Sequence, residues 1–237
     1  MKVGIKLYPE SIAYIQKIID YADFIEITAV KGYDYKELEK YGIPITIHNP
    51  HFDWKINFCN PKKFKKNVES LQFSINLANK LNSRHIIVHP EFLETKNCSA
   101  EAFAKVVNHF NDERILIENM PYITTGAFLG RTKNEIKELM ELTKTGFCLD
   151  FGHSSASACG FEKDPVIFAK ELLALKPKAF HVSDGFVNKP IDLHMHLGEG
   201  NLPWKEFKKM IPKNSWATLE TDHNKEKQIR EIAFLKR

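Results

Sequence analysis

Short apolar segments alternate with longer segments of helical periodicity along the whole chain. The apolar segments are residues 3–7, 23–27, 43–48, 85–89, 114–118, 147–150, 179–182 and 216–220. Segments with an apolar residue near every third or fourth position follow them, at residues 12–21, 35–41, 68–81, 100–110, 133–142, 165–175, 204–211 and 225–235. Such alternation is typical of a parallel sheet whose strands are joined by helices. Eight such units in 237 residues predict an α/β fold, a single (β/α)8 TIM barrel that forms one domain over residues 1–237.

The composition is that of an ordinary protein with a buried core, with 43% hydrophobic and 27% charged residues. No apolar run approaches the roughly eighteen residues that a membrane helix needs, and the first residues are too broken for a signal peptide. The four cysteines form no Cys-x-x-Cys pair, which argues against a disulfide framework and against thiolate-bound zinc. We therefore expect a cytoplasmic protein with free thiols and no membrane contact.

The net charge of +4 says little about binding partners, because lysine supplies most of the positive charge. Only five of the 34 basic residues are arginine, the side chain that grips phosphate through two parallel hydrogen bonds. The densest basic cluster, at residues 62–66, lies where a helix is predicted to begin, and a solvated helix face is the simpler interpretation there. The charge balance alone does not predict a nucleic-acid-binding protein.

Six consecutive predicted strands end on a histidine or a carboxylate. The carboxyl ends of barrel strands meet at one mouth, so these side chains are predicted to converge there. One such residue alone is more simply explained as solvated, but six together favour a metal site. The strand-end residues are His48, His89, Glu118, Asp150, His181 and Glu220, and the adjoining loops add His153, Asp192 and His194.

These nine candidate ligands are all nitrogen and oxygen donors, which suits zinc or manganese. One ion uses about four to six donors, so nine ligands predict about two or three ions, with a carboxylate such as Glu118 shared between two of them. Enzymes that attack phosphodiesters use such clustered ions to activate water and to neutralise the leaving oxygen. The pattern therefore indicates metal-dependent hydrolysis.

The motifs resemble those of the xylose isomerase-like TIM-barrel superfamily, and within it the endonuclease IV group of abasic-site endonucleases. The resemblance is clearest between Val88 and Asp222. It covers His89-Pro90, Ile117-Glu118-Asn119, residues 126–130, 148–153 and 181–184, and Leu219-Glu220-Thr221. The most specific segment is Asp192-Leu193-His194 followed by His196-Leu197-Gly198-Glu199-Gly200, which belongs to the nuclease-like branch.

The resemblance implies a TIM-barrel fold, three zinc sites and hydrolytic chemistry. His48, His89 and Glu118 would hold the first ion, and His153, Asp192 and His194 would hold the third. Glu118, Asp150, His181 and Glu220 would hold the second, with Glu118 as the bridge. The implied activity is cleavage of DNA at abasic sites by a metal-bound hydroxide, with Glu118 and Glu220 as catalytic carboxylates.

The loops that are expected to contact the substrate differ from those of the nuclease pattern. The loop at residues 28–34 is short and contains no arginine, and the family's tyrosine three residues after His48 is missing. Phe52 and Trp54 are predicted either to stack on a base or sugar or to cap the barrel mouth. Asn119 and Glu199 are the other residues predicted to line the substrate site.

Two further functions stay open at this point. A sugar or sugar-phosphate isomerase or epimerase would use one Mn, Co or Mg ion on Glu118, Asp150, His181 and Glu220, and the compact chain favours it. A metal-binding barrel without activity is the third alternative, against which the number of convergent ligands argues. The expected partner is accordingly abasic DNA or a small phosphorylated sugar.

Overall fold

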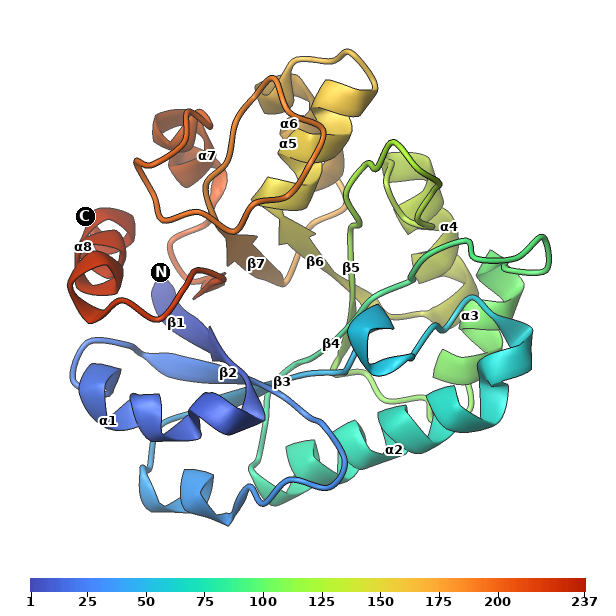
Figure 1. Ribbon diagram of the computed structural model, residues 1–237, viewed down its shortest axis with the longest axis horizontal. Helices are drawn as coiled ribbons and strands as arrows, with labels where there is room; N and C mark the ends of the chain where they lie inside the picture. Colours follow the sequence, from blue (N-terminus) through green and yellow to red (C-terminus); the bar gives the residue numbers. More distant parts are fainter.

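The structure is a computed structural model that describes all 237 residues, and it contains a closed barrel of parallel strands in sequential order (Figure 1). Helices surround the barrel on the outside, which confirms the predicted TIM barrel. The strands are β1 (Lys2–Leu7), β2 (Phe24–Thr28), β3 (Ile45–His48), β4 (Ile86–Val88), β5 (Ile115–Glu118), β6 (Gly146–Asp150), β7 (Ala179–Val182) and β8 (Trp216–Leu219).

The helices on the carboxyl-terminal two thirds of the chain lie close to the predicted segments. Several begin with side-chain caps, for example Thr132, which forms a capping box with Glu135. None of the helices combines the length and the hydropathy that a membrane-spanning segment requires. These helices are α2 (Phe64–Lys80), α3 (Ala100–Val107), α4 (Lys133–Thr143), α6 (Pro165–Leu173), α7 (Trp204–Met210) and α8 (Lys225–Lys236).

The first two predicted helices are largely wrong in type. Residues 12–21 were expected to be one helix, but the chain forms a 3-10 helix, η1 (Pro9–Tyr14), and one short turn, α1 (Ile15–Ile18). The second connection forms only the 3-10 helix η2 (Lys36–Lys40). These two connections are therefore closed mainly by 3-10 turns. Two further 3-10 turns, η3 (Phe52–Trp54) and η4 (Pro61–Lys63), follow β3.

One helix was not predicted. Helix α5 (Phe151–Gly160) begins immediately after β6, where a loop was expected to carry His153. Asp150 is the last residue of the strand and also the N-cap of this helix, because its side chain accepts a hydrogen bond from the backbone N–H of His153. The strand end and the first turn of the helix therefore form one rigid unit that fixes Asp150 and His153 relative to each other.

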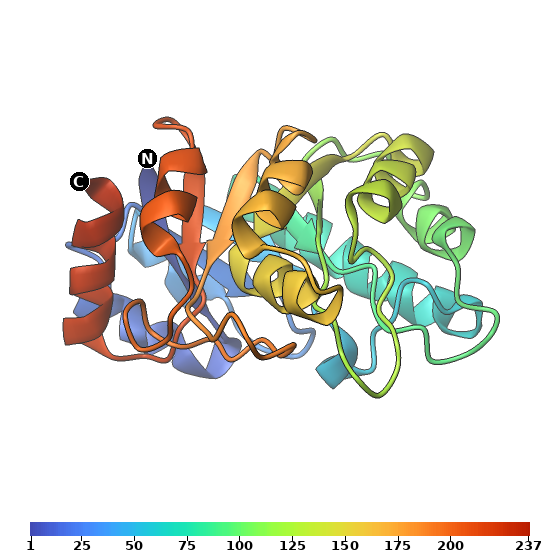
Figure 2. The same ribbon diagram turned by 90° about the horizontal axis from the view of Figure 1, so that it is seen from above.

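Alternation along the strands decides which side chains enter the barrel. Ile87, Leu116, Cys148 and Ala179 form a small buried cluster of their own, separate from the main core of 49 buried residues. Residues two positions further along these strands point the same way and lie nearer the carboxyl end. In Figure 2 the loops that follow β3, β5 and β7 project from the same end of the barrel, at the lower edge of the view. The interior is thus polar at this mouth and apolar nearer the amino-terminal ends of these strands.

His85 lies at the opposite end of the barrel, just before β4, and supplies a test of the fold. Burial, together with the charge of Arg84, lowers the pKa of His85 to about 4, and its ring packs edge-on against Trp216 at 6.1 Å. Because the folded pKa of His85 is below its unfolded value, protonation of His85 favours the unfolded state. The contribution of neutral His85 to stability is therefore complete above about pH 6.5 and is lost as the pH falls toward 4. Between pH 7 and pH 4.5, the free energy of unfolding measured with urea should fall by about 2 kcal/mol more in wild type than in His85→Leu. Equal losses in the two proteins would contradict this account.

Candidate metal centre

All nine predicted ligands lie at the carboxyl-terminal mouth of the barrel. The strand registers bring them together, since Asp150 pairs with His181 between β6 and β7, and β5 and β3 end on Glu118 and His48. Their donor atoms fall into clusters whose members lie within 4.8 Å of one another. The clusters are His48, His89 and Glu118; Glu118, Asp150 and His181; His153, Asp192 and His194; and Glu26, His48, His181 and Glu220.

The first cluster is built around one oxygen of Glu118. Glu118 Oε2 lies 3.3 Å from His48 Nε2 and 3.0 Å from His89 Nε2. The other ring nitrogen of His48 donates to the carbonyl of Asn49 at 2.8 Å, which directs Nε2 toward Glu118. Two imidazole nitrogens and a carboxylate oxygen in this arrangement match a zinc or manganese ion.

The second cluster contains buried polar atoms that make no hydrogen bond. These atoms are Glu118 Oε1, Asp150 Oδ2 and His181 Nδ1, one from each residue of the cluster. His181 Nδ1 approaches Glu118 Oε1 to 3.1 Å, but this ion-pair contact lacks hydrogen-bond geometry. A buried polar atom without a partner is costly, and a divalent cation between these three atoms would satisfy all of them. The residues of the cluster therefore fit a metal ion.

Glu220 lies at the junction of the clusters. Its Oε1 is 2.7 Å from His181 Nδ1, and its Oε2 is 3.4 Å from His194 Nε2. The predicted second set of Glu118, Asp150, His181 and Glu220 is therefore brought together around His181. In the structure Glu220 is grouped with Glu26, His48 and His181, whereas Glu118, Asp150 and His181 form a cluster without it.

The third cluster joins α5 to the loop after β7. His153 Nε2 lies 3.4 Å from Asp192 Oδ2, which is 2.7 Å from His194 Nε2. His153 Nδ1 donates to the carbonyl of Asn119 at 2.8 Å and so leaves Nε2 toward the cluster. A side chain at Gly152 would meet Asp192 Oδ1 at 2.8 Å, so glycine allows the loop to approach the helix this closely.

The electrostatics of the centre favour a cation. Burial acts to raise the pKa of Glu118, but the positive charges of His181 and His89 outweigh it and hold that pKa well below its ordinary range. Burial, opposed by His153, raises the pKa of Asp150 to about 6. Burial opposes the charged form of His194, yet Asp192 raises the pKa of His194 to about 10. A divalent ion would satisfy the same carboxylates while displacing these protons.

Sequence reasoning missed two charged residues of the centre, on the two strands to which it assigned no ligand. Lys6 of β1 places its Nζ 2.7 Å from Glu220 Oε1. Burial acts to lower the pKa of Lys6, but Glu220 and the other nearby anionic groups outweigh it, so the pKa is raised. Glu26 of β2 accepts a hydrogen bond from His181 Nε2 at 3.2 Å. Each is a lone charge between apolar neighbours in its strand, and that pattern is the signal that was available.

His51 was also missed. It stands three residues after His48, where the endonuclease IV pattern has its tyrosine. Its ring stacks on His89 with centroids 5.2 Å apart and meets Trp54 edge-on at 4.9 Å. Burial, with the neighbouring histidines, holds the pKa of His51 well below its ordinary value. His51 thus forms a neutral wall of the first cluster.

The four residues predicted to line the substrate site lie in different surroundings. Phe52 is exposed on η3, and the Trp54 ring stacks against Tyr8 with centroids 6.0 Å apart. Asn119 is fully buried. Its side-chain N–H donates to the carbonyl of Asp150, and its side-chain oxygen accepts a hydrogen bond from the backbone N–H of Asp150. The Asn119 side chain thus holds the backbone of Asp150, and its contact with substrate stays a prediction. Glu199 pairs with Lys227 at the surface and belongs to none of the ligand clusters.

Asp184, directly after β7, fixes the loop that carries Asp192 and His194. Its carboxylate accepts hydrogen bonds from the backbone N–H groups of Gly185, Gly198, Gly200 and Leu202, at 2.8 to 3.2 Å. A Cβ at Gly200 would collide with the carbonyl oxygen of Gly185, so the loop closes tightly there.

Asp184→Asn is expected to destabilise the protein by about 2–4 kcal/mol, because an amide has only one oxygen to accept these bonds. The third cluster should loosen with the loop, so the variant should lose one bound ion before the others. Urea unfolding and zinc content measured across a chelator series test both effects. A folded variant with wild-type stability and zinc retention would contradict this role of Asp184.

Two cavities lie near the centre. One of about 230 Å³ opens at the barrel mouth and is lined by Lys6, Tyr8, His194, Glu220, Thr221, Asp222 and His223. A larger one of about 660 Å³ lies beside α7 and α8, where Glu199, Trp204 and Lys227 are among its lining residues, and contains none of the nine predicted ligands. The smaller cavity reaches the centre through His194 and Glu220, two of the predicted ligands.

Comparison with known proteins places the chain in a family. The model of the xylose isomerase-like TIM barrel family matches residues 35–237. The chain belongs to this family. A relative named "Probable endonuclease 4", from Thermoplasma acidophilum, is 23% identical over 70% of this chain and 62% of its own length. The matched part of this xylose isomerase-like protein thus spans less than two thirds of that relative.

Solved structures of the same fold carry names of both enzyme types. Endonuclease IV from Thermus thermophilus has a TM-score of 0.76 at 19% identity, with 100% of this chain and 98% of that chain covered. A D-tagatose 3-epimerase-like protein has a TM-score of 0.77 at 22% identity, with 100% and 96% covered. At these identities the likeness shows a shared barrel fold.

Proposed function

We propose that this xylose isomerase-like protein is a zinc-dependent phosphodiester hydrolase that resembles endonuclease IV and cleaves DNA at abasic sites. The third cluster carries the proposal. An isomerase with a single ion on Glu118, Asp150, His181 and Glu220 has no use for His153, Asp192 and His194, yet Nε2–Oδ2 contacts of 3.4 and 2.7 Å hold these three together. The endonuclease relative supports the same activity.

Each cluster has residues suited to one part of the reaction. Zinc ions held by the clusters would supply Lewis acidity, which would lower the pKa of water and offset charge on a departing oxygen. Glu118 joins the first two clusters through its two oxygens. Glu220 lines the mouth cavity and orients or deprotonates the attacking water, while Lys6 holds its Oε1. Phe52, exposed beside the mouth, offers a ring on which a base or sugar stacks.

Incision of a defined duplex tests the proposal. A duplex with one tetrahydrofuran abasic analogue should be nicked at the analogue, while the same duplex without the analogue stays intact. The purified protein should carry about two or three zinc ions per chain, and a chelator should abolish cleavage. One exchangeable Mn or Co ion per chain, together with no cleavage, would contradict the proposal.

A second candidate is a sugar or sugar-phosphate isomerase or epimerase, and the mouth cavity favours it. About 230 Å³ lined by Lys6, Tyr8 and Glu220 suits a small polar ligand better than a DNA strand. In this reaction Glu118 and Glu220 would move a proton next to a carbonyl, on one ion held with Asp150 and His181. Turnover of ketose phosphates with one bound ion per chain would support it.

A further inference from the structure

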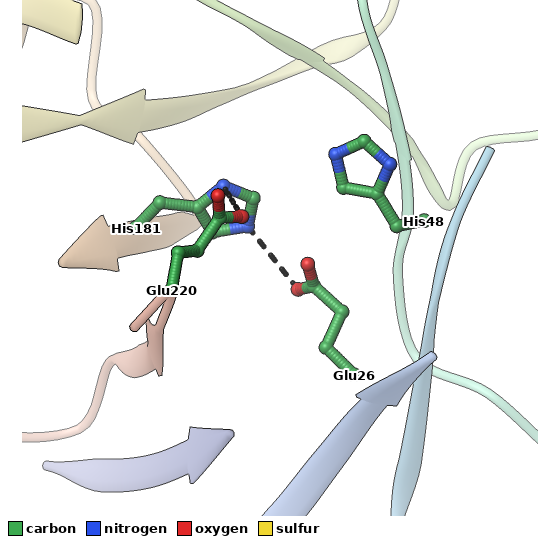
Figure 3. Close-up of side chains that lie close together, drawn as sticks. All are labelled: Glu26, His48, His181 and Glu220. Carbon is green, nitrogen blue, oxygen red and sulfur yellow. Dashed lines mark hydrogen bonds and ion pairs between the residues drawn. The ribbon is translucent and has the colours of Figure 1, made fainter. Parts of the chain in front are cut away.

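The His181 ring has a carboxylate beside each of its two nitrogens (Figure 3). Toward the predicted second set, Nδ1 lies 2.7 Å from Glu220 Oε1 and 3.1 Å from Glu118 Oε1. The other nitrogen, Nε2, lies 3.2 Å from Oε2 of Glu26, which is not one of the predicted ligands. Glu26 is thus placed to act on the centre through His181, without binding an ion itself.

Glu26 is held in this position from both sides. It lies on β2 with only 2% of its surface exposed, and Thr218 Oγ1 of β8 donates a second hydrogen bond to its Oε2 at 3.0 Å. Its Oε1 receives no hydrogen bond, so Thr218 and His181 are its hydrogen-bond partners. An ionised carboxylate only accepts hydrogen bonds, so the proton of this contact lies on His181 Nε2, and the lone pair of Nδ1 is left for an ion.

The other histidines of the predicted ligand set are held differently. His48 and His153 each donate from Nδ1 to a backbone carbonyl at 2.8 Å. Glu118 Oε1 also lies 3.2 Å from His153 Nδ1, but it is itself a predicted ligand and makes no hydrogen bond there. Nδ1 of His89 lies 3.8 Å from Glu91, which is too far for a hydrogen bond. Only the histidine of the second cluster is therefore hydrogen-bonded to a carboxylate outside the ligand set.

We infer that Glu26 is a positioning residue that fixes His181 with Nδ1 toward the centre and makes the second cluster the site that binds its ion most tightly. A hydrogen bond to an ionised acceptor is roughly twice as strong as one to a neutral carbonyl, and it makes the ring a better donor to the ion. Buried carboxylates of the same cluster, Glu118 and Asp150, add to the attraction, whereas each of the other two ligand clusters contains a single carboxylate.

Stepwise removal of zinc tests this inference, which rests on the proposed metal centre. The ring nitrogens of isotope-labelled, zinc-loaded protein are followed by NMR while a chelator is added, and single histidine-to-alanine variants assign the signals. His181 should carry its proton on Nε2, whereas His48 and His153 should carry theirs on Nδ1. The His181 signals should be the last to change. A proton on Nδ1 of His181, or loss of its ion before those of His48 and His153, would overturn the inference.

Glu26→Gln tests the contribution of the charge, because glutamine keeps the size of the side chain and an oxygen that can accept from Nε2. It should weaken binding of the last-released zinc about 10- to 100-fold. Glu231→Gln is the matched control, since Glu231 is a 3% exposed carboxylate that accepts from His196 Nδ1 at 2.9 Å, and His196 belongs to none of the clusters. It should change that affinity by less than about threefold. Equal weakening in both variants would reflect general loosening and would overturn the inference.

The outcomes separate this inference from the proposed function. A wild-type protein that binds no zinc would contradict the proposed function. A zinc-binding protein whose folded Glu26→Gln variant keeps the wild-type affinity would contradict only the role of Glu26. If Glu26→Gln does not fold, the proton position on His181 and the order of zinc release in wild type decide.

Discussion

Glu118→Gln is expected to lower any metal-dependent activity of the protein by at least about 1,000-fold, because this carboxylate serves two clusters at once. Oε2 lies 3.0 Å from His89, and Oε1 lies 3.1 Å from His181. Glutamine keeps the shape of the side chain but removes the charge that attracts ions to both clusters. The expectation holds for the hydrolase and for the isomerase alike, so this variant tests the centre and not the choice between them.

The zinc content of Glu118→Gln should fall by at least one ion per chain, in parallel with its activity. Glu138→Gln is the matched control, because Glu138 is exposed on α4 and the same substitution there should change neither quantity. Zinc is measured by mass spectrometry on protein of confirmed fold by circular dichroism. Full zinc content with more than about a tenth of the activity would mean that Glu118 is not shared between ions.

Much of this centre was predictable because parallel barrel strands all end at one mouth. A histidine or carboxylate at the end of a predicted strand needs no knowledge of packing to be placed there. That reasoning brings His48, Glu118 and His181 to the same mouth, and the structure places their donor atoms within contact distance. Ligand positions can be predicted in this way where a strand is strongly apolar and ends on a polar residue.

The parts that could not be predicted depend on register and on local capping. Lys6 and Glu26 lie inside their strands and not at the ends, so only the pairing of β1 with β2 shows that they face the centre together. Helix α5 was missed because its hydrophobic pattern is nearly uniform, as expected for a helix whose residues are mostly buried on all sides. What starts it is the cap by Asp150, a residue with two functions at once.

The placement of His153 in that helix makes it the residue that separates the two proposed functions. Both functions need Glu118, Asp150, His181 and Glu220, so loss of any of these is uninformative about the reaction. Only the proposed hydrolase would use the third cluster. His153 is held through Nδ1 by the carbonyl of Asn119 and by Glu118 Oε1, and through Nε2 by Asp192.

His153→Ala is therefore expected to remove one zinc ion per chain and to lower incision of the abasic duplex by at least about 100-fold, because charge on the leaving oxygen is no longer neutralised. Turnover of a small sugar phosphate, if the protein has that activity, should change by less than about threefold. Ser154→Ala is the matched control, since Ser154 is a buried polar neighbour on α5 that belongs to none of the clusters. Zinc content, incision rate and sugar turnover are measured on the same preparations. Unchanged incision with one ion missing would separate the third cluster from the chemistry, and unchanged zinc content would show that His153 binds no ion.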